Sequence, residues 1–302
     1  GGVVHLWTWG DEQRKVTPAR WGINGKVDQR LQRYIAARLG PLPGWTMGYG
    51  FDLDEWVNAS QLKVWRNYMH QQMGWPHLLG GRPAGPNRDA DHSRYERWNE
   101  PLDYAGYEHH RPTYEVYVAA LEAFPDKPSL SEDRFRIRES PQYASKDYSM
   151  ETTRRGLWQS TMAGGVANIW GNLTGPDGSV DTNRQGSFSY PKPDWIKTCS
   201  EFFRYRFAPD MVRDNTITDG LCLKRRGGKS YVFYKEDAAS VRMDLSKMPE
   251  ARPAVAVDAL KPYREIELGR FLPKEHVWKA PYRSDWAVAV GNGRSQSSRA
   301  EN

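Results

Sequence analysis

The sequence contains little cysteine and no long apolar run. Only two cysteines, Cys199 and Cys222, occur among 302 residues. This number excludes a dense disulfide framework, and their isolated spacing does not fit a zinc site. Whether the two pair across a domain boundary or stay free is left open by the sequence. No apolar stretch approaches the roughly 18 residues that a membrane span requires, so we expect no membrane partner.

Several signatures of metal and cofactor chemistry are also missing. The sequence has no HExxH, CxxC or GxSxG motif and no glycine-rich phosphate loop between a strand and a helix. His109 and His110 are adjacent, so in a strand they would point in opposite directions and would not bind one metal together. We therefore expect neither a metal nor a cofactor.

The charge pattern argues against a nucleic-acid partner. Lys and Arg number 43 and Asp and Glu number 37, which gives a net charge of 43 − 37 = +6. The basic residues are scattered through both halves of the chain and form no stripe that would follow a phosphate backbone.

The start of the chain shows no leader. Residues 1–9, GGVVHLWTW, lack the basic segment and the cleavage site of a signal peptide. They are typical of a buried strand. A chain that opens in a core strand is expected to be part of a longer protein.

Aromatic residues are abundant for so polar a chain. There are 13 Trp, 16 Tyr and 9 Phe, 13% of all residues, at a mean hydropathy of −0.80. Flat aromatic faces can stack on the apolar C–H faces of sugar rings, and they can equally fill a core. For any one Trp the two interpretations carry about equal weight.

Up to about residue 207, short apolar runs alternate with amphipathic stretches, which is typical of β/α units around a parallel sheet. We expect six strands, at 3–9, 45–51, 77–81, 102–109, 128–133 and 167–171. We expect helices at 27–40, 55–74, 112–124, 150–164 and 193–207. The pattern predicts an α/β fold of the (β/α)8 TIM-barrel type.

A complete barrel of this type needs eight strands, and the sequence shows six. The simplest explanation is that the first two β/α units precede residue 1, so that the visible strands are the third to the eighth; a miscounted strand is the alternative. After residue 212 the pattern changes to strict alternation, which predicts a small antiparallel β-sandwich. The expected division is a barrel domain at 1–212, a sandwich at 213–291 and a disordered tail at 292–302.

Two groups of carboxylates stand at expected strand ends, where parallel barrels place their reactive groups. Asp52, Asp54 and Glu55 follow the second strand, and Glu132 ends the fifth. Two carboxylates at such positions are what many glycoside hydrolases use. The alternatives are helix capping by the first group and an ion pair between Glu132 and a following arginine such as Arg134.

Other side chains at the expected strand ends suit a polyhydroxylated ligand, because rings stack on sugars and amides or cations bind hydroxyl groups. The candidate substrate-binding residues are His5, Trp7, Trp9, Tyr49, Arg82, His109, Arg134, Trp170 and Asn172. For each Trp, packing in the core is the competing interpretation.

Four segments carry a resemblance to a known family: residues 45–56, 127–136, 154–172 and 285–291. With them the sequence resembles the TIM-barrel glycoside hydrolases related to apiosidases, in which a small β-domain of the collagen-binding type follows the barrel. The resemblance implies an acid/base carboxyl at the end of the fourth barrel strand and a nucleophilic Glu at the end of the seventh. These roles fall on Asp52 and Glu132, with Asp54 and Glu55 as neighbouring alternatives for the first. It also implies export, to the periplasm or outside the cell.

The resulting hypothesis is a retaining glycoside hydrolase that acts on a plant or algal polysaccharide, with an oligo- or polysaccharide as its only expected partner. Glu132 would attack the sugar, and Asp52 or Glu55 would exchange the proton. The alternative is a non-catalytic carbohydrate-binding protein or an inactive barrel fragment.

Overall fold

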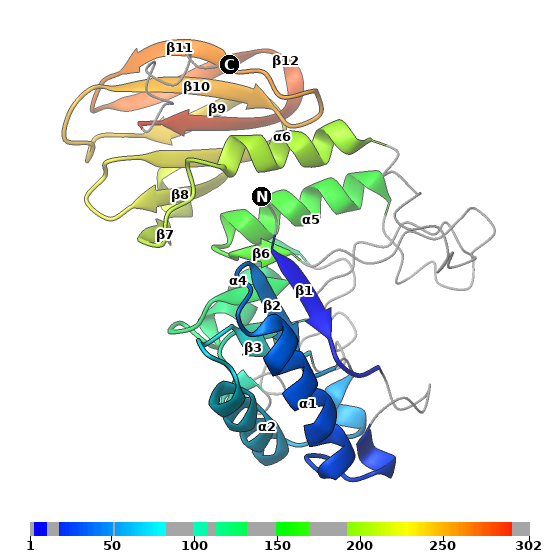
Figure 1. Cartoon of the computed structure of the whole chain (residues 1–302). Helices are drawn as coiled ribbons and strands as arrows, with labels where there is room; N and C mark the ends of the chain where they lie inside the picture. The colour runs from blue at the N-terminus through cyan, green and yellow to red at the C-terminus, as the bar shows by residue number, and fades with distance from the viewer. Residues whose placement is uncertain are drawn as a thin grey trace. The chain divides into compact units, whose positions relative to one another are not determined.

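The structure of the chain, a computed structural model, describes residues 3–10, 18–50, 52–82, 99–107, 113–131, 149–168 and 192–291. These residues form two compact units (Figure 1). The first contains the described residues from 3 to 131 together with 165–168, and the second contains 149–164 and 192–291. The expected domain boundary after residue 212 lies inside the second unit and stays a prediction.

The first unit is built on six short parallel strands. One sheet has the order β1 (Val4–Trp7), β2 (Trp45–Gly48) and β3 (Leu79–Gly80), and the other has the order β4 (Ala105–Tyr107), β5 (Ser129–Ser131) and β6 (Ala167–Asn168). All their pairings are parallel. Each lies within an expected strand, so the six strand predictions are confirmed. That two further strands complete a barrel remains a prediction.

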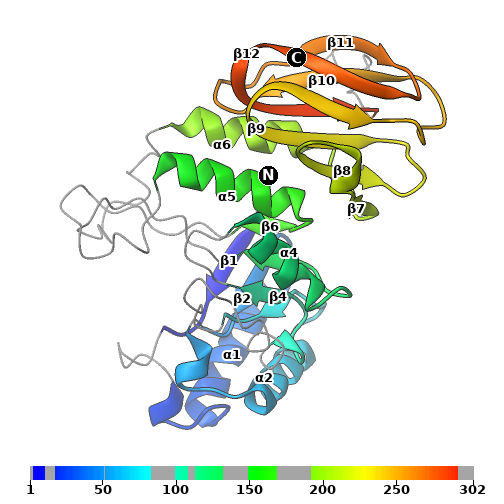
Figure 2. The same cartoon turned by 180° about the vertical axis from the view of Figure 1, so that it is seen from behind.

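Helices follow the strands as β/α units require. The helices α1 (Lys26–Leu39), α2 (Ala59–Gln72) and α4 (Tyr114–Glu122) follow β1, β2 and β4, and the 3-10 helices are η2 (Pro18–Arg20) and η3 (Leu53–Glu55). Helix α2 begins later than expected because Asn58 and Gln61 form a capping box, each side chain bonding the other's backbone N–H. Gly40 is the C-cap of α1. Figure 2 shows α1 and α2 from behind.

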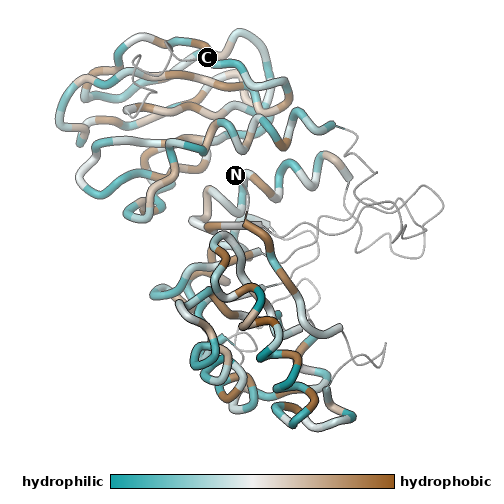
Figure 3. The backbone as a smooth tube through the Cα atoms, in the orientation of Figure 1, coloured by the Kyte–Doolittle hydropathy of each residue, from teal (hydrophilic) through white to brown (hydrophobic). Residues whose placement is uncertain are grey.

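Alternation along β2 separates a helix-facing side from an inner side. Trp45, Met47 and the following Tyr49 are buried in one apolar cluster with Leu62 and Trp65 of helix α2. Burying a large apolar side chain stabilises a fold by about 1.5–3 kcal/mol, so this cluster holds the helices on the strands. In Figure 3, apolar and polar segments alternate along α1 in the same way.

The opposite side of the strands faces a common interior. Trp7 of β1 packs against Tyr104 and Leu130, which come from the β4 and β5 regions of the other sheet. The backbone N–H of Asp103 donates to the carbonyl of Leu79 (2.8 Å) and links β3 to the strand that follows. The two sheets therefore curve around one interior, as the strands of a barrel do.

The second unit combines two helices with one antiparallel sheet. Its elements are α5 (Met150–Met162), α6 (Pro193–Phe203), β7 (Met211–Arg213), η5 (Asn215–Ile217), β8 (Leu221–Arg225), β9 (Tyr231–Asp244), β10 (Arg252–Asp258), β11 (Ile266–Phe271) and β12 (Glu275–Val290). The strand order is β11-β10-β12-β9-β8-β7. The prediction of an antiparallel sheet is confirmed, and its description as a sandwich stays a prediction.

Two strands are longer than the sequence indicates. Apolar and polar residues alternate in two separate runs, at 229–235 and 240–246, and these predict two strands, whereas the structure has one strand, β9. The last alternating run starts at residue 285, whereas β12 begins ten residues earlier. The alternation is interrupted where the pairing of β9 with β12 shifts register. Asp237 has a positive φ of 47° at this irregularity. A bulge of this kind breaks the apolar pattern without ending the strand.

Helices α5 and α6 pack on the sheet of their own unit. Trp158 stacks on Tyr234 of β9, with ring centroids 4.9 Å apart, and contacts Phe202 at 5.3 Å. Cys199 and Cys222 are both free and buried, and burial raises the pKa of both thiols. Across the described residues, none of the helices combines the length and the apolar composition that crossing a membrane requires.

Candidate active site

A buried ion pair marks the carboxyl ends of β2 and β3. Asp52 comes four residues after the end of β2, in a left-handed backbone conformation with φ 52° that is unusual for a residue other than glycine. Arg82, which is fully buried, follows β3 and donates from Nη2 to Asp52 Oδ1 at 3.0 Å. The carboxylate keeps 24% of its side-chain surface exposed. Asp52 is therefore held by a buried cation and keeps part of its carboxylate exposed.

Two rings of β1 lie next to this pair. The guanidinium carbon of Arg82 is 6.0 Å from the centroid of the Trp7 ring, and His5 contacts Trp7 edge-on at 5.2 Å. The Nδ1 atom of His5 lies 2.8 Å from Oγ1 of Thr46. Burial lowers the pKa of His5 to about 4, so this imidazole is neutral at neutral pH. The site thus has a neutral indole next to Arg82 and a neutral imidazole next to that indole, which suits the binding of an uncharged ligand.

Glu55, another acid after β2, is more exposed than Asp52. Glu55 ends the 3-10 helix η3, where its backbone N–H donates to the carbonyl of Asp52 at 3.1 Å. Its side chain is exposed. Glu55 is thus within one helical turn of Asp52, but its side chain is exposed, whereas the Arg82 side chain that holds Asp52 is buried.

Two candidate residues instead face helix α1. Trp9 donates from Nε1 to Asp28 Oδ1 (3.1 Å), and the hydroxyl of Tyr49 donates to Asp28 Oδ2 (2.6 Å). Tyr49 is fully buried, and burial, with Asp28 beside it, raises its pKa. The structure therefore places Trp9 and Tyr49 in the layer between strands and helix, and does not bring them to the Asp52–Arg82 pair. The physical reason is that Tyr49 shares the outward face of β2 with Trp45 and Met47.

The remaining candidates lie outside the described residues. They are Glu132, His109, Arg134, Trp170 and Asn172. Of the residues that the sequence singled out, the structure brings together His5, Trp7, Asp52 and Arg82.

Tyr104 and Thr46 join this group although no motif of the sequence marks them. Tyr104 lies 6.1 Å from His5 between ring centroids and packs on Trp7 from the far side of the interior. Thr46 stands between two outward-facing residues of β2, so alternation alone places it inside. The alternation along β1 and β2 is visible in the sequence, and it places His5 and Thr46 on the same inner face of the sheet.

Within the described ranges, no group of three or more His, Cys, Asp or Glu side chains is arranged to hold a metal ion.

Known proteins resemble this chain in fold and not in sequence. No protein-family model matches the chain, and no curated protein matches its sequence. A glycoside hydrolase of family 5 from Bacteroides vulgatus ATCC 8482 matches with a TM-score of 0.69 and 16% identity, over 96% of this chain and 71% of that one. The fold is similar to that of a glycoside hydrolase.

Two further solved glycoside hydrolases have a similar fold. One glycoside hydrolase matches with a TM-score of 0.63 and 14% identity, over 88% of this chain and 69% of that chain. A family 30 endoxylanase from Clostridium papyrosolvens C71 matches with a TM-score of 0.52 and 9% identity, over 88% and 71%. At these identities the comparison establishes the fold, which includes the parallel strands on which the site stands.

Proposed function

We propose that the chain is a glycoside hydrolase of the apiosidase-related kind that acts on a plant or algal polysaccharide. The observation that carries the proposal is the similarity to a glycoside hydrolase fold over 96% of the chain. The Asp52–Arg82 pair supports it, because it stands at the carboxyl ends of parallel strands, where barrel enzymes hold their reactive groups. A secreted or periplasmic location belongs to the same proposal.

The proposed reaction retains the configuration of the sugar and uses two carboxyl groups. Glu132 attacks the anomeric carbon while the glycosidic C–O bond breaks and the departing oxygen takes a proton from the acid/base residue. Water then attacks the glycosyl–Glu132 ester and gives its proton back to that residue. Retention requires the two carboxyl groups to lie about 5–5.5 Å apart, and inversion about 6.5–9.5 Å.

Asp52 and Glu55 are the two candidates for the acid/base role. Asp52 is held at the carboxyl end of β2 by its ion pair with Arg82, and 24% of its side-chain surface stays exposed. Glu55 is exposed and stands one turn away, so it is the alternative donor of the proton. Trp7 and His5 would line the sugar site beside them, and His109, Arg134, Trp170 and Asn172 would complete its rim.

The deciding experiment compares carboxyl variants on two substrates. Glu132→Gln is expected to lose turnover on polysaccharides and on aryl glycosides alike, because no other group forms the covalent bond. The acid/base variant, Asp52→Asn or Glu55→Gln, is expected to lose about 10²–10⁴-fold on a polysaccharide, where the leaving oxygen needs a proton. On a dinitrophenyl glycoside, the same variant is expected to keep most of the rate of the first step, because this leaving group departs without a proton.

Glu115→Gln is the matched control, because Glu115 is an exposed carboxylate in the first turn of α4. Its turnover should equal that of the unchanged chain. Full activity of Glu132→Gln on every substrate would contradict the nucleophile assignment. Binding of a polysaccharide without turnover by the unchanged chain would favour a non-catalytic carbohydrate-binding protein.

A further inference from the structure

The second unit carries a groove of about 850 Å³ that no part of the proposed reaction uses. Its walls come from the end of β10, the loop between β10 and β11, the start of β11, and β12. The residues that matter for its chemistry are Asp258, Lys261, Tyr263, Glu265, Glu267 and Tyr282. All of them belong to the second unit, so the groove is complete within it.

The loop that forms one wall is fastened to helix α6. Trp195 donates from Nε1 to the carbonyl of Leu260 at 2.7 Å. Thr198 donates from Oγ1 to the carbonyl of Lys261, also at 2.7 Å. Side-chain bonds to two successive carbonyls fix the backbone of this loop, so little conformational entropy would be lost when a ligand binds to it.

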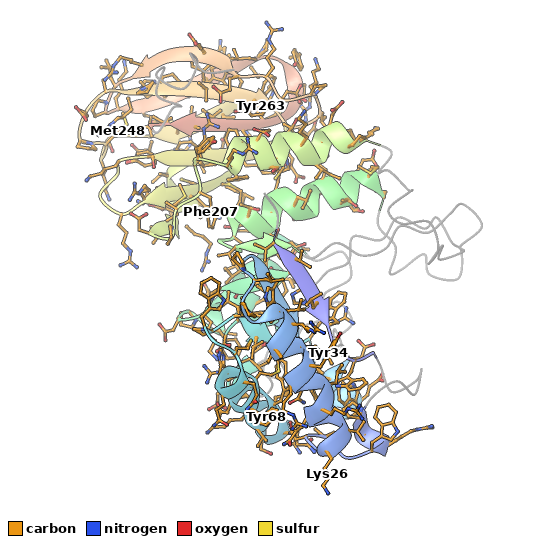
Figure 4. All side chains as sticks on the ribbon, in the orientation of Figure 1. Lys26, Tyr34, Tyr68, Phe207, Met248 and Tyr263 are labelled. Atoms are coloured by element: carbon orange, nitrogen blue, oxygen red, sulfur yellow. The ribbon has the colours of Figure 1, made fainter. Side chains whose placement is uncertain are left out.

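A buried arginine fixes the far end of the same wall. Arg206 is only 5% exposed and donates from Nη2 to Glu265 Oε1 at 2.6 Å. The hydroxyl of Tyr263 also donates to Glu265 and accepts from Arg206 Nη1 at 3.3 Å. The tyrosine ring is therefore held by its polar end. Figure 4 labels Tyr263 in this unit.

The second ring of the groove is exposed and equally well held. Tyr282 is 41% exposed, and its hydroxyl donates to Asp258 Oδ2 at 2.8 Å. Asp258 is itself fixed by the hydroxyl of Ser284 (2.7 Å) and the backbone N–H of Leu260 (2.9 Å). The amine of Lys261 lies 4.1 Å from the centroid of the Tyr282 ring. Lys261 is an exposed residue that covers this ring face, so a sugar ring that stacks on Tyr282 takes the place of its amine.

The charges of the groove are close to balanced. Asp258 and Glu265 already have partners in the fold, and the exposed charges that remain are Lys261, Arg264 and Glu267. Carboxylate oxygens in the wall can accept hydrogen bonds from hydroxyl groups. Two held aromatic rings with acceptors around them match a neutral, polyhydroxylated ligand.

We propose that this groove binds a neutral saccharide chain, as a second attachment point for the polysaccharide that the first unit hydrolyses. The proposal rests on the proposed function for the link between binding and hydrolysis. Tyr282 supplies the stacking face, and Glu267 accepts hydrogen bonds from the sugar hydroxyls.

The test measures retention of the full chain by soluble polysaccharides in affinity gel electrophoresis, on a panel of neutral plant and algal polymers. Tyr282→Ala is expected to weaken binding about tenfold and Glu267→Ala about threefold, since each removes one contact with the sugar. Tyr282→Phe keeps the ring and is expected to bind nearly as the unchanged chain. Tyr205→Ala is the control, because Tyr205 is 60% exposed on the same unit but does not line the groove.

Turnover of a small aryl glycoside separates this proposal from the proposed function. It should be the same in Tyr282→Ala as in the unchanged chain, which also shows that the variant is folded. The proposal of a saccharide site would be refuted if Tyr282→Ala, Glu267→Ala and the unchanged chain bound every polymer equally. It would also be refuted if the unchanged chain bound no polymer. Binding that is lost in Tyr282→Ala without any hydrolysis by the unchanged chain would keep the groove and refute the hydrolase.

Discussion

Two aspartates of the first unit show how surroundings decide what a carboxylate does. Asp28 is fully buried and accepts hydrogen bonds from Trp9, Tyr49 and the backbone of Asn24, so each of its oxygens is engaged within the fold. Asp52 pairs with the buried guanidinium of Arg82 and keeps about a quarter of its side-chain surface exposed. The first is a structural group that joins α1 to the strands. The second retains the access that a reacting carboxylate needs.

The buried imidazole of His5 makes stability depend on pH. Burial lowers its pKa to about 4 from an ordinary value of 6.5. Between these values the unfolded chain binds a proton that the folded chain does not. The free energy of unfolding is therefore undiminished by His5 above pH 6.5 and falls as the pH drops toward 4, by up to roughly 3 kcal/mol.

Urea unfolding from pH 8 to pH 4 checks this expectation. His5→Asn, whose amide can replace Nδ1 at Thr46, should show a shallower fall than the unchanged chain below pH 6.5. Above pH 6.5 the difference between the two proteins should be constant, which serves as the internal control. Parallel curves over the whole range would contradict the assignment of the effect to His5.

At the scale of elements, the approach of β3 to β4 depends on one glycine. A Cβ atom at Gly80 would lie 2.0 Å from Cζ of Tyr104, closer than any real contact allows. The ring of Tyr104 is fully buried between Gly80 and the rings of β1 and has no space to move into. The glycine thus permits an aromatic side chain to fill the interior at this level.

Gly80→Ala is expected to lower the free energy of unfolding by about 3 kcal/mol or more, because overpacking at this site forces the strands apart. Urea unfolding followed by tryptophan fluorescence measures the change. Gly74→Ala is the matched control, since a Cβ at Gly74 meets nothing within 4 Å. Equal stability of the two variants would show that the interior has room around Tyr104.

At the scale of the whole molecule, the two units have separate cores. In the first, Met69 and Trp65 of α2 are fully buried with β2, and in the second, Trp158 of α5 stacks on Tyr234 of β9. No described residue belongs to both the α2 cluster and the cluster inside the antiparallel sheet. Each unit therefore has the buried surface to unfold as a cooperative body of its own.

Hydrogen exchange of two truncation variants tests this independence. Trp158→Ala is expected to cost about 4 kcal/mol and to reduce protection in β9 and α6 while α1 and α2 keep theirs. Met69→Ala is expected to cost about 3 kcal/mol and to give the opposite pattern. Loss of protection throughout the molecule in either variant would show that the units unfold together.

Local patterns of the sequence determined the six parallel strands, the helices and the antiparallel character of the second unit. They did so because apolar periodicity depends only on which face of an element is buried. The same patterns misjudged the lengths of β9 and β12, since the bulge at Asp237 breaks the alternation while cross-strand hydrogen bonds continue.

Only the tertiary structure decided which polar side chains meet. Arg82 lies 30 residues from Asp52 in the chain, and nothing in either segment specifies that their side chains pair at 3.0 Å. Trp9, in the loop after β1, also shows this: its side chain donates to Asp28 of α1, whereas Trp7 packs in the interior with Tyr104 and Leu130. Such contacts depend on how strands and helices pack, whereas the elements themselves depend on the burial pattern of neighbouring residues.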